Sequence, residues 1–344
     1  MPVEGRTHIP IIDHEKCNTC MVCMRGCPAE IIPEQRREES SLRGRIYQDI
    51  KTAPSLGIEP VEMPPCQQAC PIHQDVRGYI RLIADREYIE ALKLIRETNA
   101  LPSVTGYVCH HPCEAACPRK LIEGPVAIKN LKRFVADFDD GRLIPSEIKK
   151  NGKKVSIIGS GPSGLAAAYE LAKDGYTVEV IEALSQPGGM LRWAIPSFRL
   201  PEDVLNRDIK YIERMGVAIK TSVKFGVDVT LSELKKEGAD AIIMAIGTHQ
   251  GLKIGIENER SISGYIDCLD FLRKYADGEQ VALGDKVIVV GGGNAAIDAA
   301  RSGLRCGAKE VAIIYRRSHE EMPADRDEIR EAEAEVTIFT SDVP

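Results

Sequence analysis

The chain has 344 residues, which is enough for two or three domains with hydrophobic cores. Its composition, with 43% hydrophobic and 28% charged residues, is typical of a globular protein, and its net charge of −6 excludes a basic nucleic-acid-binding surface. No segment approaches the ~18 consecutive apolar residues of a membrane span, and the N-terminus lacks the apolar core of a signal peptide. These features predict a cytoplasmic protein whose thiols stay reduced and do not form disulfides.

Cysteines are concentrated in the N-terminal third of the chain, where nine of the eleven occur. The first group, in residues 1–33, has three-residue steps followed by a Cys-Pro pair, with cysteines at Cys17, Cys20, Cys23 and Cys27. This spacing suits a loop that wraps around a [4Fe–4S] cubane. A structural zinc site is the weaker alternative, because such sites usually pair two Cys-x-x-Cys units across a longer insert. Cys27 either completes this cluster or serves a second one.

A second cysteine group follows residues 34–65, a charged and proline-punctuated segment that we interpret as a linker. This group comprises Cys66, Cys70, Cys109, Cys113 and Cys117. Between its two parts, apolar residues recur at helical spacing from Asp75 to Glu97, and a further helix is predicted from Val126 to Phe138. A helical hairpin would bring the two parts together, which favours a second cluster over the alternative of buried free cysteines.

The number of cysteines limits the number of clusters. Two [4Fe–4S] clusters need eight ligands and three need twelve, so nine cysteines predict two clusters, with one cysteine spare or shared. Cys268 and Cys306 stand alone further along the chain, and we interpret them as core residues. His110 and His111 are interpreted as loop residues, because histidine ligands belong to a different cluster type.

From Lys153 onward, short Val/Ile-rich strands alternate with helices, as in parallel α/β sheets. The predicted strands are Val155–Ile158, Val178–Ile181, Ala241–Ala245, Val287–Val290 and Val311–Ile314. The pattern occurs twice, and each time the first strand ends in glycines. We therefore predict an α/β plus α protein with a ferredoxin-like segment (1–33), the linker (34–65), a helical [4Fe–4S] domain (66–145) and two Rossmann-like dinucleotide-binding domains (146–250 and 251–344).

The first glycine-rich loop fits G-x-G-x-x-G between a strand and a helix, with Gly159, Ser160, Gly161, Pro162, Ser163 and Gly164. Its glycines permit a tight turn, a close approach to a pyrophosphate and close packing of helix on strand, and the helix N-terminus faces the phosphates. Glu182 ends the next predicted strand, eighteen residues after Gly164. An acid there accepts hydrogen bonds from a ribose hydroxyl, so the loop predicts a nucleotide without a 2′-phosphate, as in FAD.

The second loop fits G-x-G-x-x-A, with Gly291, Gly292, Gly293, Asn294 and Ala295. Here the following strand leads into Arg316 and Arg317 instead of an acid. Arginine pairs with a 2′-phosphate in a bidentate fork, which favours NADP(H) over NAD(H). The alternative is that the two arginines belong to a solvated strand end.

Nine motifs together resemble a known family: Cys66–Pro71, Gly124–Asn130, Gly159–Gly164, Glu182–Ala183, Gly188–Arg192, Ile195–Pro201, Gly291–Asn294, Tyr315–Ser318 and Glu321–Ala324. They are similar to the small (beta) subunit of NADPH-dependent glutamate synthase, to the large subunit of the electron-bifurcating NADH-dependent ferredoxin:NADP oxidoreductase and to the N-terminal half of dihydropyrimidine dehydrogenase. The resemblance implies FAD at the first loop and NADPH at the second. It also implies that Gly188, Gly189, Met190, Leu191, Arg192 and Gly247 lie at the flavin.

The sequence departs from this family in three places. Gly57–Val61 stands where the family usually has two more cysteines, and Lys132 stands where relatives have a Glu or Gln cluster ligand. Both departures predict one cluster in the helical domain instead of two. The sequence also ends at Pro344, before the part of the family fold that completes the FAD domain, so we expect either a fragment or a partner that supplies the rest.

The combined motifs predict an NADPH-dependent flavin and iron–sulfur oxidoreductase subunit. It would pass electrons between NADPH, FAD and two [4Fe–4S] clusters and a redox partner or larger complex, such as a ferredoxin, a hydrogenase or a formate dehydrogenase module. One alternative is a glutamate synthase small subunit with an amidotransferase partner, and another is a non-catalytic electron conduit. Hydride transfer needs no acid or base from a side chain, so no catalytic residue is nominated.

Overall fold

The computed structural model describes the backbone of residues 46–49 and 53–58, and residues 63–341 except 140, 142, 144, 146, 147, 252, 256 and 260. The predicted cluster segment Cys17–Cys27 lies outside the described residues. The chain divides into two compact units, Met1–Val76 with His111–Val126, and Arg77–His110 with Ala127–Pro344. Among the helices described, none is long and apolar enough to cross a membrane.

In the first unit, two short strands pair and two short helices contact each other. Strands β1 (Ile46–Asp49) and β2 (Ala53–Ile58) are antiparallel and lie within the segment that the sequence suggests is a linker. Helix α2 (Pro65–Gln68) contacts α6 (Pro112–Ala115), and the 3₁₀ helix η2 (Pro118–Leu121) follows. Each of these three helices begins with a proline, whose missing N–H is not needed in a first turn.

The second unit begins with a helical part made of α3 (Val76–Ala84), α4 (Tyr88–Arg96), α5 (Pro102–Val108) and α7 (Ile128–Ala136). The prediction of one continuous helical pattern from Asp75 to Glu97 is wrong, because Arg86 adopts a left-handed conformation (φ 64°) that ends the first helix. Helix α5 packs closely on α7. A side chain at Gly106 would bring its Cβ to 2.8 Å from the Arg133 Cα, so only glycine fits this contact.

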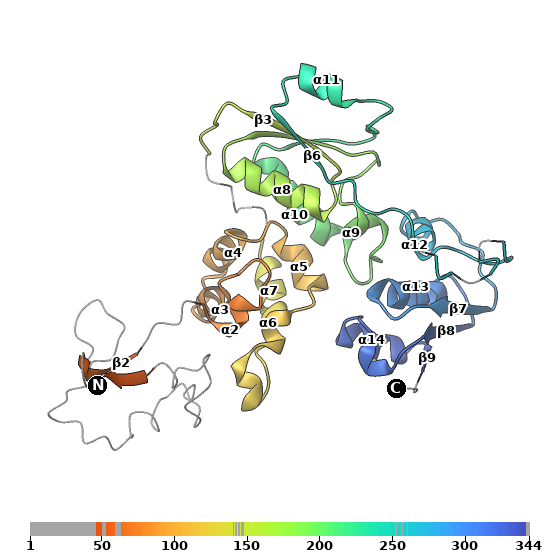
Figure 1. Ribbon diagram of the computed structural model, residues 1–344, viewed down its shortest axis with the longest axis horizontal. Helices are drawn as coiled ribbons and strands as arrows, with labels where there is room; N and C mark the ends of the chain where they lie inside the picture. Colours follow the sequence, from red (N-terminus) through yellow and green to blue (C-terminus); the bar gives the residue numbers. More distant parts are fainter. Residues whose placement is uncertain are drawn as a thin grey trace. The chain divides into compact units, whose positions relative to one another are not determined.

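A four-stranded parallel sheet follows, in the order β5-β4-β3-β6 (Figure 1). Its elements are β3 (Lys154–Ile158), α8 (Pro162–Lys173), β4 (Thr177–Ile181), α9 (Met190–Trp193), α10 (Glu202–Arg214), β5 (Ala218–Lys220), α11 (Leu231–Lys236) and β6 (Ala241–Met244). Buried Ile157, Val180 and Leu165 form one core with Leu92 and Val104 of the helical part. The helical part of this unit and the first sheet are therefore packed as one body.

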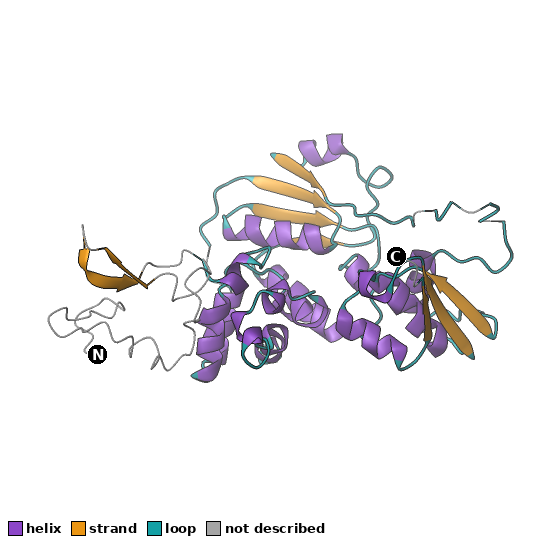
Figure 2. Cartoon of the chain, turned by 60° about the horizontal axis from the view of Figure 1, so that its bottom comes forward, coloured by secondary structure: helices purple, strands orange, loops and turns teal. Residues whose placement is uncertain are grey.

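A second parallel sheet has the order β7-β8-β9. Its elements are α12 (Cys268–Ala276), β7 (Lys286–Val290), α13 (Asn294–Arg305), β8 (Glu310–Tyr315), η3 (His319–Glu321), α14 (Arg326–Glu333) and β9 (Thr337–Thr340). Figure 2 shows the helices gathered on one face of this sheet. Exposed apolar side chains of its strands are Ile288, Val290, Ile314 and Phe339.

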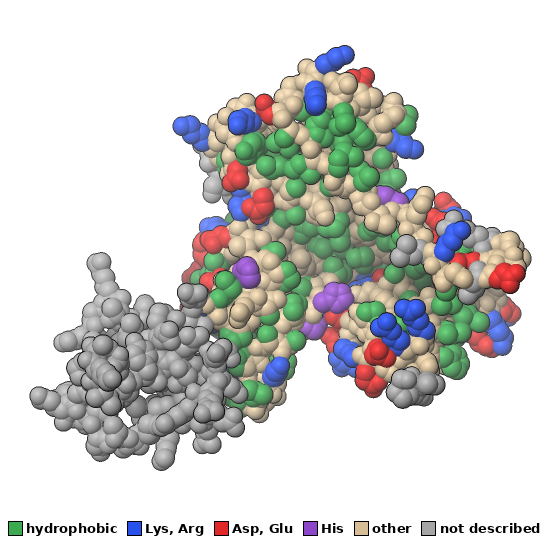
Figure 3. Space-filling model, in the orientation of Figure 1, with side chains coloured by type: hydrophobic (Ala, Val, Ile, Leu, Met, Phe, Trp, Pro, Cys, Tyr) green, Lys and Arg blue, Asp and Glu red, His purple; other side chains and the backbone are tan. Residues whose placement is uncertain are grey.

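The predicted alternation of strands and helices is confirmed. All five predicted strands agree with observed strands to within one residue at each end, and the short strands β5 and β9 are additional. At the edge of the first sheet, Met244 and the following Ile246 are exposed. Figure 3 shows hydrophobic side chains gathered on the surface of the region that holds β3 and β6.

Candidate functional site

The first glycine-rich loop connects β3 to α8, as the sequence predicts. Gly159 has φ 104°, and a Cβ there would lie 2.3 Å from the carbonyl oxygen of Ala245. A Cβ on Gly164 would lie 1.9 Å from the Gly159 carbonyl oxygen, so α8 is packed as close to the strand as its backbone allows. A larger residue at Gly164 would push the helix away from the strand, and one at Gly159 would clash with the backbone that follows β6.

Glu182 lies beside this loop, directly after β4. One carboxylate oxygen accepts hydrogen bonds from the Ser160 N–H (3.0 Å) and hydroxyl (2.5 Å), and the other accepts one from the Leu184 N–H (2.9 Å). Ser160 is fully buried and Glu182 is almost so. Because a carboxylate offers about four acceptor positions, Glu182 retains capacity for a further donor while it fixes the loop.

A second pair of glycines meets the loop from the other side. The N–H of Gly188 donates to the Ser160 carbonyl oxygen (3.1 Å), and a Cβ on Gly189, where φ is 54°, would lie 2.6 Å from the Gly161 Cα. The next three residues, Met190, Leu191 and Arg192, open α9. Gly247 follows β6 and is exposed. The structure therefore brings together the glycines of two motifs that are nearly thirty residues apart in sequence.

Arg192 is buried and held by its neighbours. Its Nε donates to the Pro187 carbonyl oxygen (2.7 Å) and its Nη2 to Asn206 Oδ1 (2.5 Å), while Glu202 lies 4.0 Å from Nη1. Burial lowers the pKa of the Arg192 guanidinium, and the nearby carboxylate of Glu202 opposes this effect. Through these hydrogen bonds, Arg192 connects the segment before the second glycine pair to α10.

The second glycine-rich loop connects β7 to α13 in the same way. Gly291 has φ 144°, and a Cβ on Gly292 would lie 2.5 Å from the Tyr315 ring. A Cβ on Gly293 would meet nothing within 4 Å. Asn294 begins the helix, and its Oδ1 accepts a hydrogen bond from the Asp325 N–H (2.8 Å). The last predicted residue of this loop, Ala295, is exposed.

Arg316 and Arg317 follow β8 and are both exposed. The chain then turns through a capping box, in which Glu321 accepts hydrogen bonds from the Ser318 N–H (3.1 Å) and hydroxyl (3.0 Å). These bonds lower the pKa of Glu321, and the charge of Arg317 adds to the effect. The two guanidinium groups are accessible and lie at the carboxyl end of the strand next to β7, the edge at which parallel sheets bind nucleotides.

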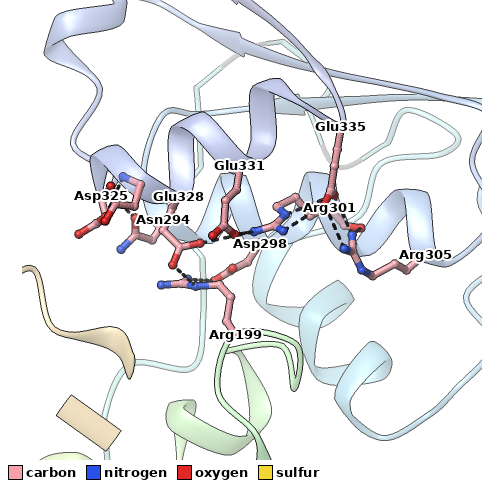
Figure 4. A network of polar contacts seen from close by, with 10 residues as sticks. Arg199, Asn294, Asp298, Arg301, Arg305, Asp325, Glu328, Glu331 and Glu335 are labelled. Atoms are coloured by element: carbon pink, nitrogen blue, oxygen red, sulfur yellow. Dashed lines mark hydrogen bonds and ion pairs between the residues drawn. The ribbon is translucent and has the colours of Figure 1, made fainter. Parts of the chain in front are cut away.

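A buried group of charges joins the segment between α9 and α10 to the second sheet (Figure 4). Arg199 Nη1 lies 2.6 Å from Asp298 Oδ2 on α13, and Arg199 Nε lies 2.9 Å from Glu328 Oε1 on α14. Burial raises the pKa of Asp298 to about 6, although the hydrogen bond from Arg199 partly offsets this. Arg301 continues the network to Glu331 (2.8 Å) and to Glu335 (3.1 Å).

The described cysteines of the second group form no disulfides. Cys66 lies in α2 and Cys113 in α6, the two helices that contact each other, and Cys70 and Cys117 follow the ends of these helices in the same unit. Cys109 ends α5. Lys132 is buried in α7. His110 and His111 lie outside helices and strands, as predicted.

The two solitary cysteines pack against an apolar cluster around Phe271, Leu272 and Ala299, in agreement with their interpretation as core residues. Burial raises the pKa of the Cys268 thiol to about 11. It is therefore a poor nucleophile at neutral pH.

The sequence motifs did not identify the residues that form hydrogen bonds and ion pairs with the motif side chains. Arg199 lies inside the Ile195–Pro201 motif and Asp298 lies after the second glycine loop, but no spacing rule relates two residues separated by 99 positions. Asn206 and Asp325, which hold Arg192 and Asn294, likewise lie outside the glycine motifs. Only a charged residue within an otherwise apolar motif, such as Arg199 in Ile195–Pro201, offered a signal.

Two family descriptions match the chain. The family "Dihydroprymidine dehydrogenase domain II, 4Fe-4S cluster" matches residues 60–142, and "Pyridine nucleotide-disulphide oxidoreductase" matches residues 137–338. The first covers the second cysteine group and the second covers both glycine-rich loops.

Several known proteins are similar to the chain over most of its length. The chain is 42% identical over 323 residues to the NADP(+)-dependent formate dehydrogenase subunit beta of Moorella thermoacetica, with 86% of this chain and 46% of the relative covered. It is 43% identical over 282 residues to the NADPH-Fe(3+) oxidoreductase subunit beta of Geobacter sulfurreducens, with 80% of this chain and 42% of the relative covered. It is 36% identical over 296 residues to the glutamate synthase [NADPH] small chain of Escherichia coli, with 81% of this chain and 62% of the relative covered. The chain spans less than half the length of the first two relatives.

Proposed function

Because this chain belongs to the pyridine nucleotide-disulphide oxidoreductase family and carries a dihydropyrimidine dehydrogenase-type 4Fe-4S domain, we propose that it is a subunit of an NADPH-dependent flavin and iron–sulfur oxidoreductase. It would pass electrons between NADPH, FAD and [4Fe–4S] clusters and a partner protein. The observation that carries the proposal is the pair of strand–loop–helix units in one compact unit, one followed by a buried acid and the other by two exposed arginines.

The first loop fits an FAD pyrophosphate and ribose. Gly161 has no side chain at the N-terminus of α8, and the next two residues, Pro162 and Ser163, are exposed, which supports access of an anion to the helix end. Glu182 has acceptor capacity left for a ribose hydroxyl. The proposed FAD residues are Gly159, Ser160, Gly161, Pro162, Ser163, Gly164, Glu182, Gly188, Gly189, Met190, Leu191, Arg192 and Gly247. FAD, when bound, supplies the exchange between two-electron hydride chemistry and single-electron transfer.

The second loop fits NADP(H). Gly293 leaves open space at the N-terminus of α13, where backbone N–H groups point outward. Arg316 and Arg317 are accessible for a 2′-phosphate, and an acid at that position would repel it. The proposed NADP(H) residues are Gly291, Gly292, Gly293, Asn294, Ala295, Arg316 and Arg317.

The second cysteine group fits one [4Fe–4S] cluster. A cubane needs four thiolates, and five cysteines are available in α2, α6 and the adjoining turns. We propose that four of Cys66, Cys70, Cys109, Cys113 and Cys117 hold this cluster. Cys17, Cys20, Cys23 and Cys27 are proposed to hold the other.

The chain's own residues do no acid–base chemistry in this proposal. Their role would be to hold the reacting groups in alignment, and within the second unit the shared core of the helical part and the first sheet supplies a rigid support for the first loop. The thiolate ligands must stay reduced, and we therefore propose a cytoplasmic location.

The partner is proposed to be a formate dehydrogenase-type or similar redox module. The match to the formate dehydrogenase subunit beta covers more of this chain (86%) than the match to the glutamate synthase small chain (81%). The second candidate remains a glutamate synthase small subunit, because the chain is 36% identical to that relative over 296 residues.

Anaerobic purification of the full-length protein tests the proposal. We expect bound FAD, about eight irons per chain and dye reduction that NADPH drives much faster than NADH. Among single Cys→Ser variants of the five cysteines in the second group, four should lose about half of the iron and one should keep it. Eight irons without flavin would favour an electron conduit, and about four or fewer irons would contradict the two clusters. Identification of the co-purifying subunit by mass spectrometry separates the two candidate partners.

A further inference from the structure

The segment between α9 and α10 is held against the second α/β part by two adjacent side chains. Arg199 contacts both Asp298 and Glu328, which lie on α13 and α14. The neighbouring Phe198 ring lies beneath two guanidinium groups, with the Arg305 Cζ at 4.2 Å and the Arg301 Cζ at 5.0 Å from its centroid. The segment between α9 and α10 therefore contacts α13 through the Phe198 ring and contacts both α13 and α14 through the ion pairs of Arg199.

These contacts are buried, unlike most ion pairs of this unit. The side chains of Arg199 and Asp298 are 6% and 4% exposed, and that of Glu328 is 14% exposed. By contrast, Lys286 and Glu310, a pair at 2.8 Å in the same sheet, are 75% and 67% exposed. A buried ion pair adds little net stability compared with apolar packing, but it strongly penalises any arrangement that separates its charges. Such a pair is suited to fixing one orientation of the segment between α9 and α10 relative to α13.

The two sides of this contact belong to the two candidate nucleotide sites. Arg199 follows the Gly188–Gly189 pair that meets the first loop, whereas Asp298 lies one helical turn after Asn294 in the second loop. Asp298 Oδ1 is buried and accepts no hydrogen bond from the residues that the structure describes, so Arg199 provides the main compensation for this charge. Loss of Arg199 would remove this compensation from the buried Asp298, and α13 would lose its ionic contact with the segment between α9 and α10.

We propose that Arg199 is a positioning residue that, through Asp298 and Glu328, holds the NADP(H)-binding helix at a fixed distance from the flavin-binding segment. This inference rests on the proposed function for the identity of the two nucleotides, whereas the contact itself does not depend on them. Arg199 lies on the flavin side, and among the residues that the structure describes its ion pairs are with Asp298 and Glu328, which lie outside both glycine loops. Its loss should therefore leave each nucleotide bound and disturb only their alignment. Misalignment of reacting groups by about 1 Å lowers a rate by on the order of a hundredfold.

The test compares Arg199→Ala, Arg199→Lys and Asp298→Asn with the exposed-pair control Lys286→Ala in the full-length protein. Hydrogen–deuterium exchange without nucleotide should rise in residues 195–201 and 294–305 for Arg199→Ala and Asp298→Asn, and not for the control. Calorimetric NADP⁺ affinity should change less than about threefold, and flavin content should not change. Stopped-flow reduction by NADPH should slow by about tenfold to a hundredfold. Arg199→Lys should recover part of the rate, because lysine pairs with one carboxylate but not with two in a fork.

Exchange in the Arg199→Ala and Asp298→Asn variants equal to that of the control would overturn the positioning role, whether or not the protein binds NADP⁺. A large loss of NADP⁺ affinity with an unchanged reduction rate at saturation would also overturn it. Failure of the unmodified protein to be reduced by NADPH would instead refute the proposed function. If Arg199→Ala does not fold, the Arg199→Lys and Asp298→Asn variants decide by the same readouts.

Discussion

The helical part is joined to the first sheet by a buried charge group whose energetics can be measured directly. Arg96 Nη2 lies 3.1 Å from Asp208 Oδ1 and 3.2 Å from Asp139 Oδ2, and all three side chains are at most 2% exposed. Asp208 also accepts a hydrogen bond from the Val104 N–H (2.9 Å). Two carboxylates thus share one guanidinium, which leaves an excess of one buried negative charge. Burial accordingly raises the pKa of Asp208 to about 6.

The shared guanidinium predicts strong coupling between the two acids. Asp208→Asn removes the excess charge, keeps an acceptor for Val104 and leaves Arg96 paired with Asp139, so it should lower the free energy of unfolding by only about 1 kcal/mol. Asp139→Asn should cost a similar amount. The double variant leaves the buried guanidinium without a carboxylate and should cost about 3–5 kcal/mol. Urea unfolding at pH 7, with m-values checked for constancy, gives the three free energies. Single costs that simply add up to the double cost would refute this account.

The pH dependence provides a second check on Asp208. Its pKa is higher in the folded chain than the ordinary 3.8, so the folded state binds the proton more tightly. Its contribution to stability is therefore fully present below pH ~4 and is lost as the pH rises through about 6. The stability difference between Asp208→Asn and the unmodified protein should become more unfavourable to the variant as the pH is lowered from 7 to 5. Subtraction removes the similar contribution of Asp298, and a pH-independent difference would contradict the prediction.

Three further predictions concern the second α/β part. Replacing Arg316 and Arg317 together with alanine should raise the KM for NADPH by at least about tenfold, because a 2′-phosphate loses its charged hydrogen bonds, and should leave the KM for NADH little changed; equal effects on both would exclude a role in specificity. Gly292→Ala forces a Cβ to within 2.5 Å of an aromatic ring and should weaken NADP⁺ binding in calorimetry, whereas Gly303→Ala, within α13, places its Cβ only 3.8 Å from its nearest neighbours and serves as the matched control. Hydrogen bonds from arginines lower the pKa of Glu335 to about 2, so its stabilisation is present above pH ~4.5 and declines as the pH falls toward 2. Glu335→Gln should therefore cost about 1 kcal/mol at pH 7 and less at pH 3 in urea titrations.

Local patterns predicted the elements that carry the site. The alternation of apolar strands and helices placed all five predicted strands, and Gly159, Gly161 and Gly164 identified the first loop because tight turns and close helix–strand contacts tolerate only glycine. The helical spacing of apolar residues did not predict the break at Arg86, where a left-handed backbone conformation separates α3 from α4.

The sequence alone determined the chemical types of the sites: cysteines at cluster spacing, two glycine loops, an acid after one and arginines after the other. These features are local, since a turn, a helix N-terminus and a following strand lie within about thirty residues. Only the tertiary structure decided which distant residues hold these sites together, as Arg199 does with Asp298 and Arg96 with Asp208. Such pairs depend on the burial and orientation of side chains from different elements, and no sequence spacing encodes that geometry.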